Sequence, residues 1–273
     1  MITRSIGNEH FERVCQDFKF IVDRIHDENG ELDLRLRDNY FNLYYRGNSL
    51  AKVNVDRLPY TIEINKAFAM QVIDNARFGE PKVSKEYCVY KVDPKKLHAF
   101  LSKTVIDGLC RKIKTRNYGE EITFEQLLIT DNQDRADFVI IDRQVQGGTL
   151  GRSRIDLLAL QHTGTGKQYK FVIVEVKLGN NPELRGDVAD QLQRYVEIMD
   201  RDFLEYKQCY ERTYRQMKEL RLLEEAIFKE VEIVKPVTGL IVVGGYPGLA
   251  RQAELDLKQG HPNLNLRKIS YQI

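Results

Sequence analysis

The sequence predicts an α/β protein in which a β-rich accessory domain, residues 1–92, precedes an α/β domain, residues 93–273. Three observations carry this prediction. Residues 32–64 alternate apolar and polar side chains between turn signals, which is typical of strands with one buried face. The apolar periodicity at 93–113 and 186–199 predicts amphipathic helices. Between these helices lie short runs rich in Val, Ile and Leu, which indicate strands buried on both faces.

Length and charge set the first limits on function. At 273 residues the chain can bury a substantial core. Its 42 Lys and Arg residues nearly balance its 40 Asp and Glu residues. Overall basicity therefore does not indicate a nucleic-acid partner, and a surface that binds one must be a local patch.

Cysteine and hydropathy patterns predict a cytoplasmic protein. The four cysteines are far apart and form no C-x-x-C pair, which predicts reduced thiols: Cys15, Cys88, Cys110 and Cys209. The five histidines show no ligand spacing, so a zinc site is not expected. There is neither an apolar signal core at the N-terminus nor a run of membrane-spanning length, so no membrane association is expected.

The N-terminal region is predicted to form hairpins after an initial helix. Residues 8–25 indicate a short amphipathic helix, or a helix that runs into a strand. Strands are predicted at 32–37, 39–45, 50–55 and 60–64. The tyrosines of this region suit base stacking, but packing of a small sheet is the favoured interpretation.

A helix at 93–113, with Asp93 and Pro94 as its start signal, follows a predicted strand at 87–90. It ends in a basic group of three residues: Arg111, Lys112 and Lys114. Cations at a helix C-terminus complement its dipole, but the same group could steer phosphates, and the sequence leaves both interpretations open. Residues 123–126 then match a capping box and predict the start of a short helix.

Charged residues interrupt two strands that are otherwise apolar. The run 154–158 carries Asp156, and the run 171–177 carries Glu175 and Lys177. Because strand side chains alternate with period two, Glu175 and Lys177 share one face. If the two strands pair, Asp156 lies beside Glu175, and two carboxylates can hold a hard divalent cation. The nearby lysine can orient or deprotonate a water, so the residues predict metal-assisted phosphodiester hydrolysis.

The remaining elements are helices and a final strand pair. In the helix at 186–199, Gln191 and Tyr195 are four residues apart and share a face. Residues from about 200 to 232 are rich in charge with a sparse apolar stripe, which predicts one long helix or a helical hairpin inserted before the last core strand. A bundle face or a homodimer seam is the favoured interpretation, over nucleic-acid contact by Arg212, Arg215 and Lys218. A buried strand at 237–243, a helix at 249–259 and an edge strand at 264–271 complete the chain.

Asp156, Glu175-x-Lys177 and Gln191-x-x-x-Tyr195, in this order and on these elements, resemble the PD-(D/E)XK nuclease superfamily, in the branch with a Q-x-x-x-Y helix. The resemblance implies an α/β fold with a restriction-endonuclease-like αβββαβ core and a mixed sheet. It covers about the last two-thirds of the chain. The eponymous proline of the family is absent.

The resemblance implies a Mg²⁺- or Mn²⁺-dependent deoxyribonuclease. Asp156, Glu175 and the backbone carbonyl of Val176 would hold the metal, and Lys177 would position the attacking water. Arg154, just before the first acid, is a candidate contact to nucleic acid together with the basic helix end.

Further residues follow from the same resemblance. Gln191 and Tyr195 would brace the site or contact the DNA backbone. A glutamate on the first core helix would add an acidic group, for which Glu125 is the best match and Glu121 the second. The alternative is a catalytically silent nucleic-acid-binding or assembly protein that retains the nuclease fold. The intact trio of two acids and a lysine argues against it.

Overall fold

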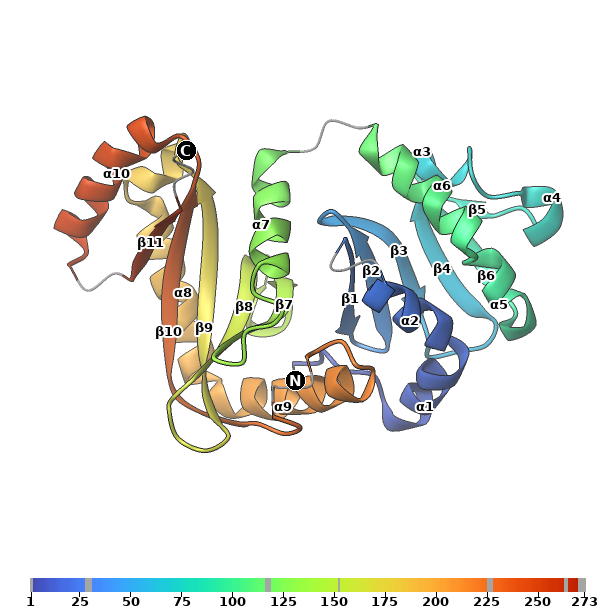
Figure 1. Cartoon of the computed structure of the whole chain (residues 1–273), viewed down its shortest axis with the longest axis horizontal. Helices are drawn as coiled ribbons and strands as arrows, with labels where there is room; N and C mark the ends of the chain where they lie inside the picture. The colour runs from blue at the N-terminus through green and yellow to red at the C-terminus, as the bar shows by residue number, and fades with distance from the viewer. Residues whose placement is uncertain are drawn as a thin grey trace. The chain divides into compact units, whose positions relative to one another are not determined.

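The computed structural model describes residues 2–27, 31–115, 119–151, 153–224, 228–262 and 265–269, and the chain divides into two compact units (Figure 1). Unit 1 comprises residues 1–2, 119–215 and 223–273, and unit 2 comprises residues 3–118 and 216–222. The sequence-based boundary at residue 92 therefore differs from this division, which falls after residue 118. The helices of residues 94–114 belong to unit 2, where Gly108 lies so close to Val72 that a Cβ there would be 2.7 Å from its methyl group.

Unit 2 is built on a six-stranded antiparallel sheet with the order β1-β2-β3-β4-β6-β5. Its strands are β1 (Leu32–Arg37), β2 (Tyr40–Tyr45), β3 (Asn48–Asn54), β4 (Tyr60–Asn65), β5 (Lys82–Val83) and β6 (Tyr87–Val92). The predicted series of hairpins is confirmed. Tyr45, Tyr60 and Tyr90 are buried, so these tyrosines pack the sheet.

The helices of unit 2 correct two predictions. They are α1 (Asn8–Asp17), α2 (Lys19–Asp27), α3 (Lys66–Ala69), α4 (Asn75–Phe78), α5 (Pro94–Phe100) and α6 (Lys103–Lys114). Residues 8–25 form two helices and no strand, because Phe18 interrupts the helix and packs edge-on against Phe41 and Tyr60. The single helix predicted at 93–113 is divided at Leu101, and Ser102 is the N-cap of the second helix.

Unit 1 is built on a five-stranded mixed sheet with the order β11-β10-β9-β8-β7 (Figure 1). Its strands are β7 (Phe138–Gln146), β8 (Arg154–His162), β9 (Gln168–Leu178), β10 (Glu232–Gly244) and β11 (Leu266–Ile269). Strands β7, β8 and β9 are antiparallel, whereas β10 runs parallel to β9 and to β11. The final strand was predicted at 264–271. Residue 264 and residues 270–271 lie outside the described residues.

Helices cover both faces of the unit 1 sheet: α7 (Glu120–Thr130), α8 (Asp187–Arg201), α9 (Phe203–Glu219) and α10 (Pro247–Gly260). Phe124 of α7 packs with Val174 and Val176, and α8 covers the opposite face, where Leu192 lies against Gly239. Glycine is required at 239 because a Cβ would lie 2.7 Å from Leu192. The predicted capping box at 123–126 is wrong, because α7 already begins at Glu120 after its N-cap residue.

Among the described residues of the predicted insertion there is one helix, α9, whose first part belongs to unit 1. Phe203 and Tyr210 pack edge-on against Phe171 of β9. The hydroxyl of Tyr210 donates a 2.9 Å hydrogen bond to Asp142 of β7. This part of the apolar stripe therefore packs within the core of unit 1.

The structure bears on the predictions for the cysteines and for membrane-spanning segments. None of the four cysteines forms a disulfide. In the part of the chain that the structure describes, no helix combines the length and the apolar character needed to cross a membrane.

Candidate active site

The two strands that carry the predicted acids separate at the site. The ladder between β8 and β9 ends with Leu157 opposite Val174, so the next residues in register are Asp156 and Glu175. The Asp156 carboxylate accepts a 2.9 Å hydrogen bond from the backbone N–H of Val176. The Asp156 side chain thus takes the place of a backbone acceptor on β8. Because the strands separate here, Asp156 and Glu175 lie just beyond the last paired residues of the ladder.

Glu175 is a buried carboxyl group without a hydrogen-bond partner. Its exposed fraction is 0 %, and neither carboxylate oxygen has a hydrogen-bond partner. Burial and then the negative charge of Asp156 raise its pKa. Leaving a buried acid without a hydrogen bond is costly, so Glu175 is a candidate ligand for a cation.

Lys177 lies among three carboxylates that come from three different elements. Its Nζ is 3.0 Å from Glu183, 3.6 Å from Glu175 and 3.8 Å from Glu121. Burial acts to lower the pKa of Lys177, but the charges of Asp156 and Glu175 outweigh it and raise the pKa above its usual value. The side chain is therefore a cation at neutral pH, which favours an electrostatic role over that of a general base.

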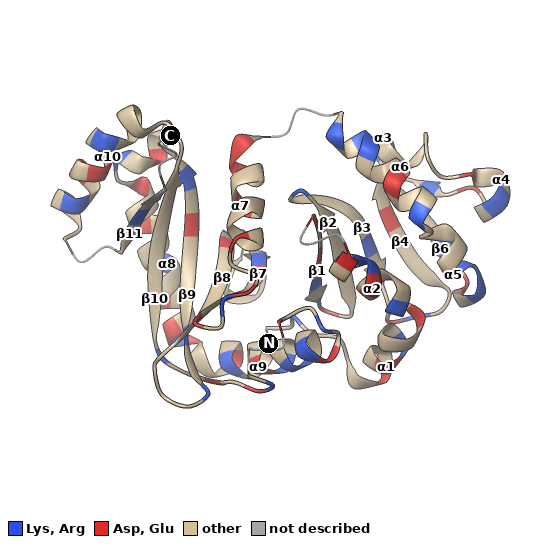
Figure 2. Ribbon diagram, viewed as in Figure 1, with Lys and Arg blue, Asp and Glu red and all other residues tan. Residues whose placement is uncertain are grey.

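An open cavity of about 550 Å³ brings together five of the predicted site residues and the second-choice glutamate of α7. Its lining includes Glu121, Arg154, Asp156, Lys177, Gln191 and Tyr195. The acidic residues of this region come from different elements, and the ribbon in Figure 2 is red for acidic residues on both α7 and β9. Glu175 does not line the cavity; it is fully buried, 3.6 Å from the Lys177 ammonium.

The Gln191 and Tyr195 pair braces the start of β8. The amide of Gln191 donates a 2.8 Å hydrogen bond to the Tyr195 hydroxyl, which in turn donates to the backbone carbonyl of Arg154 at 3.3 Å. Both side chains come from α8, one helical turn apart. This chain of contacts fixes the backbone two residues before Asp156.

The two glutamates of α7 have different surroundings. Glu121 lines the cavity and accepts a hydrogen bond from Asn181 at 3.3 Å. Glu125 is buried and pairs with Arg143 at 3.2 Å. Burial and then the charge of Asp156 raise the pKa of Glu125 to about 7. Glu125, the preferred match from the sequence, does not line the cavity, whereas Glu121 does.

The predicted basic group belongs to unit 2. Arg111, Lys112 and Lys114 form the last turn of α6. The Lys114 ammonium lies 5.6 Å from the ring centre of Tyr45, and a hydrogen bond to that tyrosine raises the pKa of Lys114.

Asn181 and Glu183 also line the cavity, although no sequence pattern singles them out as site residues. The Asn181 side chain accepts a 2.9 Å hydrogen bond from the Glu183 N–H and begins the short 3₁₀ helix η2 (Pro182–Arg185). The Asn-Pro pair indicated only a turn, and no periodic pattern marks the direction of the Glu183 side chain. Only the tertiary structure brings it to Lys177.

A metal ion is implied by the resemblance, and the donor set fits one in part. Asp156 and Glu175 offer carboxylate oxygens, which hard divalent cations prefer. Val176 donates its N–H toward Asp156, and its carbonyl projects to the same side of the strand. No group of three or more His, Cys, Asp or Glu side chains with metal-binding geometry occurs among the described residues. The protein would thus supply few ligands, and water or substrate oxygens the others.

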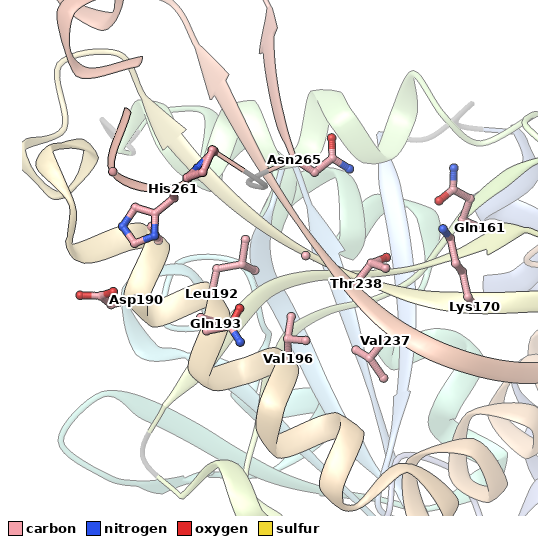
Figure 3. Close-up of a pocket in the computed structure, with 14 residues that line it drawn as sticks. Gln161, Lys170, Asp190, Leu192, Gln193, Val196, Val237, Thr238, His261 and Asn265 are labelled. Atoms are coloured by element: carbon pink, nitrogen blue, oxygen red, sulfur yellow. The ribbon is translucent and has the colours of Figure 1, made fainter. Parts of the chain in front are cut away.

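A second cavity, of about 580 Å³, lies between α8 and β10 (Figure 3). Lys170, Asp190 and His261 are among its lining residues, and none of the predicted site residues is. Its polar groups lack the paired carboxylates of the first cavity. The predicted site residues that line a cavity therefore line the one at the ends of β8 and β9.

Comparisons with protein-family models, curated proteins and solved structures found no match to this chain.

Proposed function

We propose that the chain is a metal-dependent nuclease with a restriction-endonuclease-like core that hydrolyses phosphodiester bonds of DNA. The observation that carries the proposal is the fully buried carboxyl group of Glu175, which has no hydrogen-bond partner and lies 3.6 Å from Lys177, a residue that lines one cavity together with Asp156. The element order α7, β7, β8, β9, α8, β10 is the αβββαβ order that the resemblance implies. DNA rather than RNA follows from the resemblance.

Each site residue is assigned a role that its chemistry allows. Asp156 and Glu175 would hold a Mg²⁺ or Mn²⁺ ion, which supplies charge neutralisation and polarises a phosphate oxygen or water when bound. Lys177 remains protonated and stabilises the negative charge that develops on the phosphate. Tyr195 holds the Arg154 backbone, which fixes the direction from which Asp156 enters the cavity.

A second candidate function is a silent binding or assembly protein that retains the fold. The contacts of Lys177 with Glu121, Glu175 and Glu183 favour it, because they neutralise part of the acidic group without any ligand. A metal-free ion-pair network of this kind can support a fold alone. A cytoplasmic location is proposed for either function on the basis of the four free cysteines.

The test is incubation of supercoiled, linear and single-stranded DNA with the purified protein, with Mn²⁺ or with EDTA. We expect cleavage with Mn²⁺ and none with EDTA. Lys177→Met should remove the activity, and Lys170→Met, a matched change on the same strand but at the second cavity, should retain it. Intact DNA in every reaction with Mn²⁺ would contradict the proposal and favour the silent protein.

A further inference from the structure

Glu183, rather than Glu175, is the hydrogen-bond partner of the Lys177 ammonium. The distance is 3.0 Å to Glu183 and 3.6 Å to Glu175. Only the first is within hydrogen-bond range, and charge-assisted bonds of this length are the stronger kind. As a result the buried Glu175 carboxylate has no hydrogen-bond partner, although the Lys177 ammonium forms a longer ion pair with it.

The loop that carries Glu183 is fixed independently of Lys177. Asn181 accepts a hydrogen bond from the Glu183 N–H at 2.9 Å and donates one to Glu121 at 3.3 Å. Leu184, the next residue, is buried. At Gly179 a Cβ would lie only 2.5 Å from the carbonyl oxygen of Gly245, so the loop start is packed closely against the turn after β10. The Glu183 carboxylate is thus presented to Lys177 by a braced backbone.

We infer that Glu183 is a positioning residue that draws the Lys177 ammonium away from Glu175 and so keeps the Glu175 carboxylate open to a divalent cation. The inference rests on the proposed function, because it names how this chain maintains its cation site. Glu183 lies outside the Asp, Glu-x-Lys and Gln-x-x-x-Tyr pattern.

The physical basis is competition for one ammonium group. Without Glu183, the nearest acceptors of Lys177 are Glu175 and, at 3.8 Å, Glu121. Glu175 is the better acceptor, because its oxygens are buried and unpartnered. A small rotation of the lysine side chain would close the pair, and a divalent cation would then have to break it before binding.

The first test is a crystal structure of metal-free Glu183→Gln protein beside the wild type. We expect the distance from Lys177 Nζ to Glu175 to shorten from 3.6 Å to hydrogen-bond length, about 2.9 Å. Glu183→Asp, which keeps the charge, should shorten it less. An unchanged distance in Glu183→Gln would overturn the inference, whether or not the protein is a nuclease.

The second test measures Mn²⁺ affinity by calorimetry in a double-mutant cycle. Glu183→Gln should weaken Mn²⁺ binding by about tenfold or more, because the cation must first break the charge-assisted hydrogen bond that Lys177 then forms with Glu175. In the Lys177→Met background the same change should have little effect, because no ammonium remains to close onto Glu175.

The matched control is Glu120→Gln, which removes one nearby negative charge from α7 without touching Lys177. It should reproduce only the small electrostatic part of the effect. An equal loss of affinity from Glu183→Gln with and without Lys177 would overturn the inference. A wild-type protein that binds no Mn²⁺ would overturn the proposed function, while the crystallographic distance still decides the role of Glu183.

Discussion

Asp156 accepts its hydrogen bond from the backbone N–H of Val176 at 2.9 Å, just beyond the last paired residues of β8 and β9. The Asp156 carboxylate therefore accepts a hydrogen bond from a β9 backbone N–H that has no partner in the β8–β9 ladder. One contact thus serves the fold and orients the first acid of the candidate site.

Asp156→Asn is expected to separate these two roles. The amide oxygen can still accept the Val176 N–H, so we expect the free energy of unfolding to change by about 1 kcal/mol or less. The lost charge should weaken Mn²⁺ binding and abolish DNA cleavage. Calorimetry and a cleavage assay measure this, with Asp190→Asn at the second cavity as control. Unchanged Mn²⁺ binding in Asp156→Asn would remove this residue from the metal site.

Lys177→Met is expected to affect turnover rather than metal binding. An ammonium cannot ligate a metal, so Mn²⁺ affinity should stay the same or rise when this positive neighbour is lost. Loss of a positioned electrostatic group costs on the order of a hundredfold in rate. Cleavage kinetics and thermal unfolding should be measured together. A folded Lys177→Met protein with a near wild-type rate would refute the catalytic role, and loss of the fold would support a purely structural ion pair.

Glu125 is expected to make stability depend on pH. Because its pKa is raised to about 7 in the folded protein, the folded state keeps a proton that the unfolded chain releases near its ordinary value of 4.5. Stability therefore falls as the pH rises through this window, by an amount that approaches about 3 kcal/mol above pH 7.

The measurement is the free energy of unfolding of the wild type and Glu125→Gln between pH 5 and 8. The variant should show the flatter profile, because the amide does not titrate. Glu197→Gln, at an exposed position of α8, is the control and should follow the wild type. Parallel profiles for wild type and Glu125→Gln would show that Glu125 does not retain its proton.

The basic end of α6 is expected to bind DNA phosphates. Reversal of Arg111, Lys112 and Lys114 to Glu should weaken DNA binding and flatten its salt dependence, because each phosphate contact releases counterions. Fluorescence anisotropy at several salt concentrations measures both. Lys95→Glu with Lys96→Glu, at exposed positions of the same unit, is the control pair. If the triple variant keeps the wild-type salt slope, these residues only complement the helix dipole.

The parts of the fold and site that depend on local periodicity could be predicted from the sequence. The shared face of Glu175 and Lys177 follows from the period of a strand, and the shared face of Gln191 and Tyr195 from the period of a helix. Asp156 lies near Glu175 only if β8 pairs with β9. The sequence alone did not establish this pairing, and the register of the two strands shows it.

The parts that depend on tertiary packing could not be predicted. No Gly or Pro marks the break between α5 and α6, because Leu101 leaves the helix to stay buried in unit 2. The choice between Glu121 and Glu125 depends on the position of α7 over the sheet. Glu183 approaches Lys177 only because a short turn folds back onto the strand end, and a turn signal does not fix the direction of a side chain.

The proposed function requires that Glu175, which has no hydrogen-bond partner in the protein, binds a divalent cation. Calorimetric titration of Mn²⁺ into the wild type and Glu175→Gln tests it most directly, with unfolding measured on the same samples without metal. The account predicts that the wild type binds Mn²⁺, that Glu175→Gln does not, and that the variant is at least as stable without metal because it buries no ionisable acid. Equal Mn²⁺ binding by both proteins, or no binding by the wild type, would contradict it.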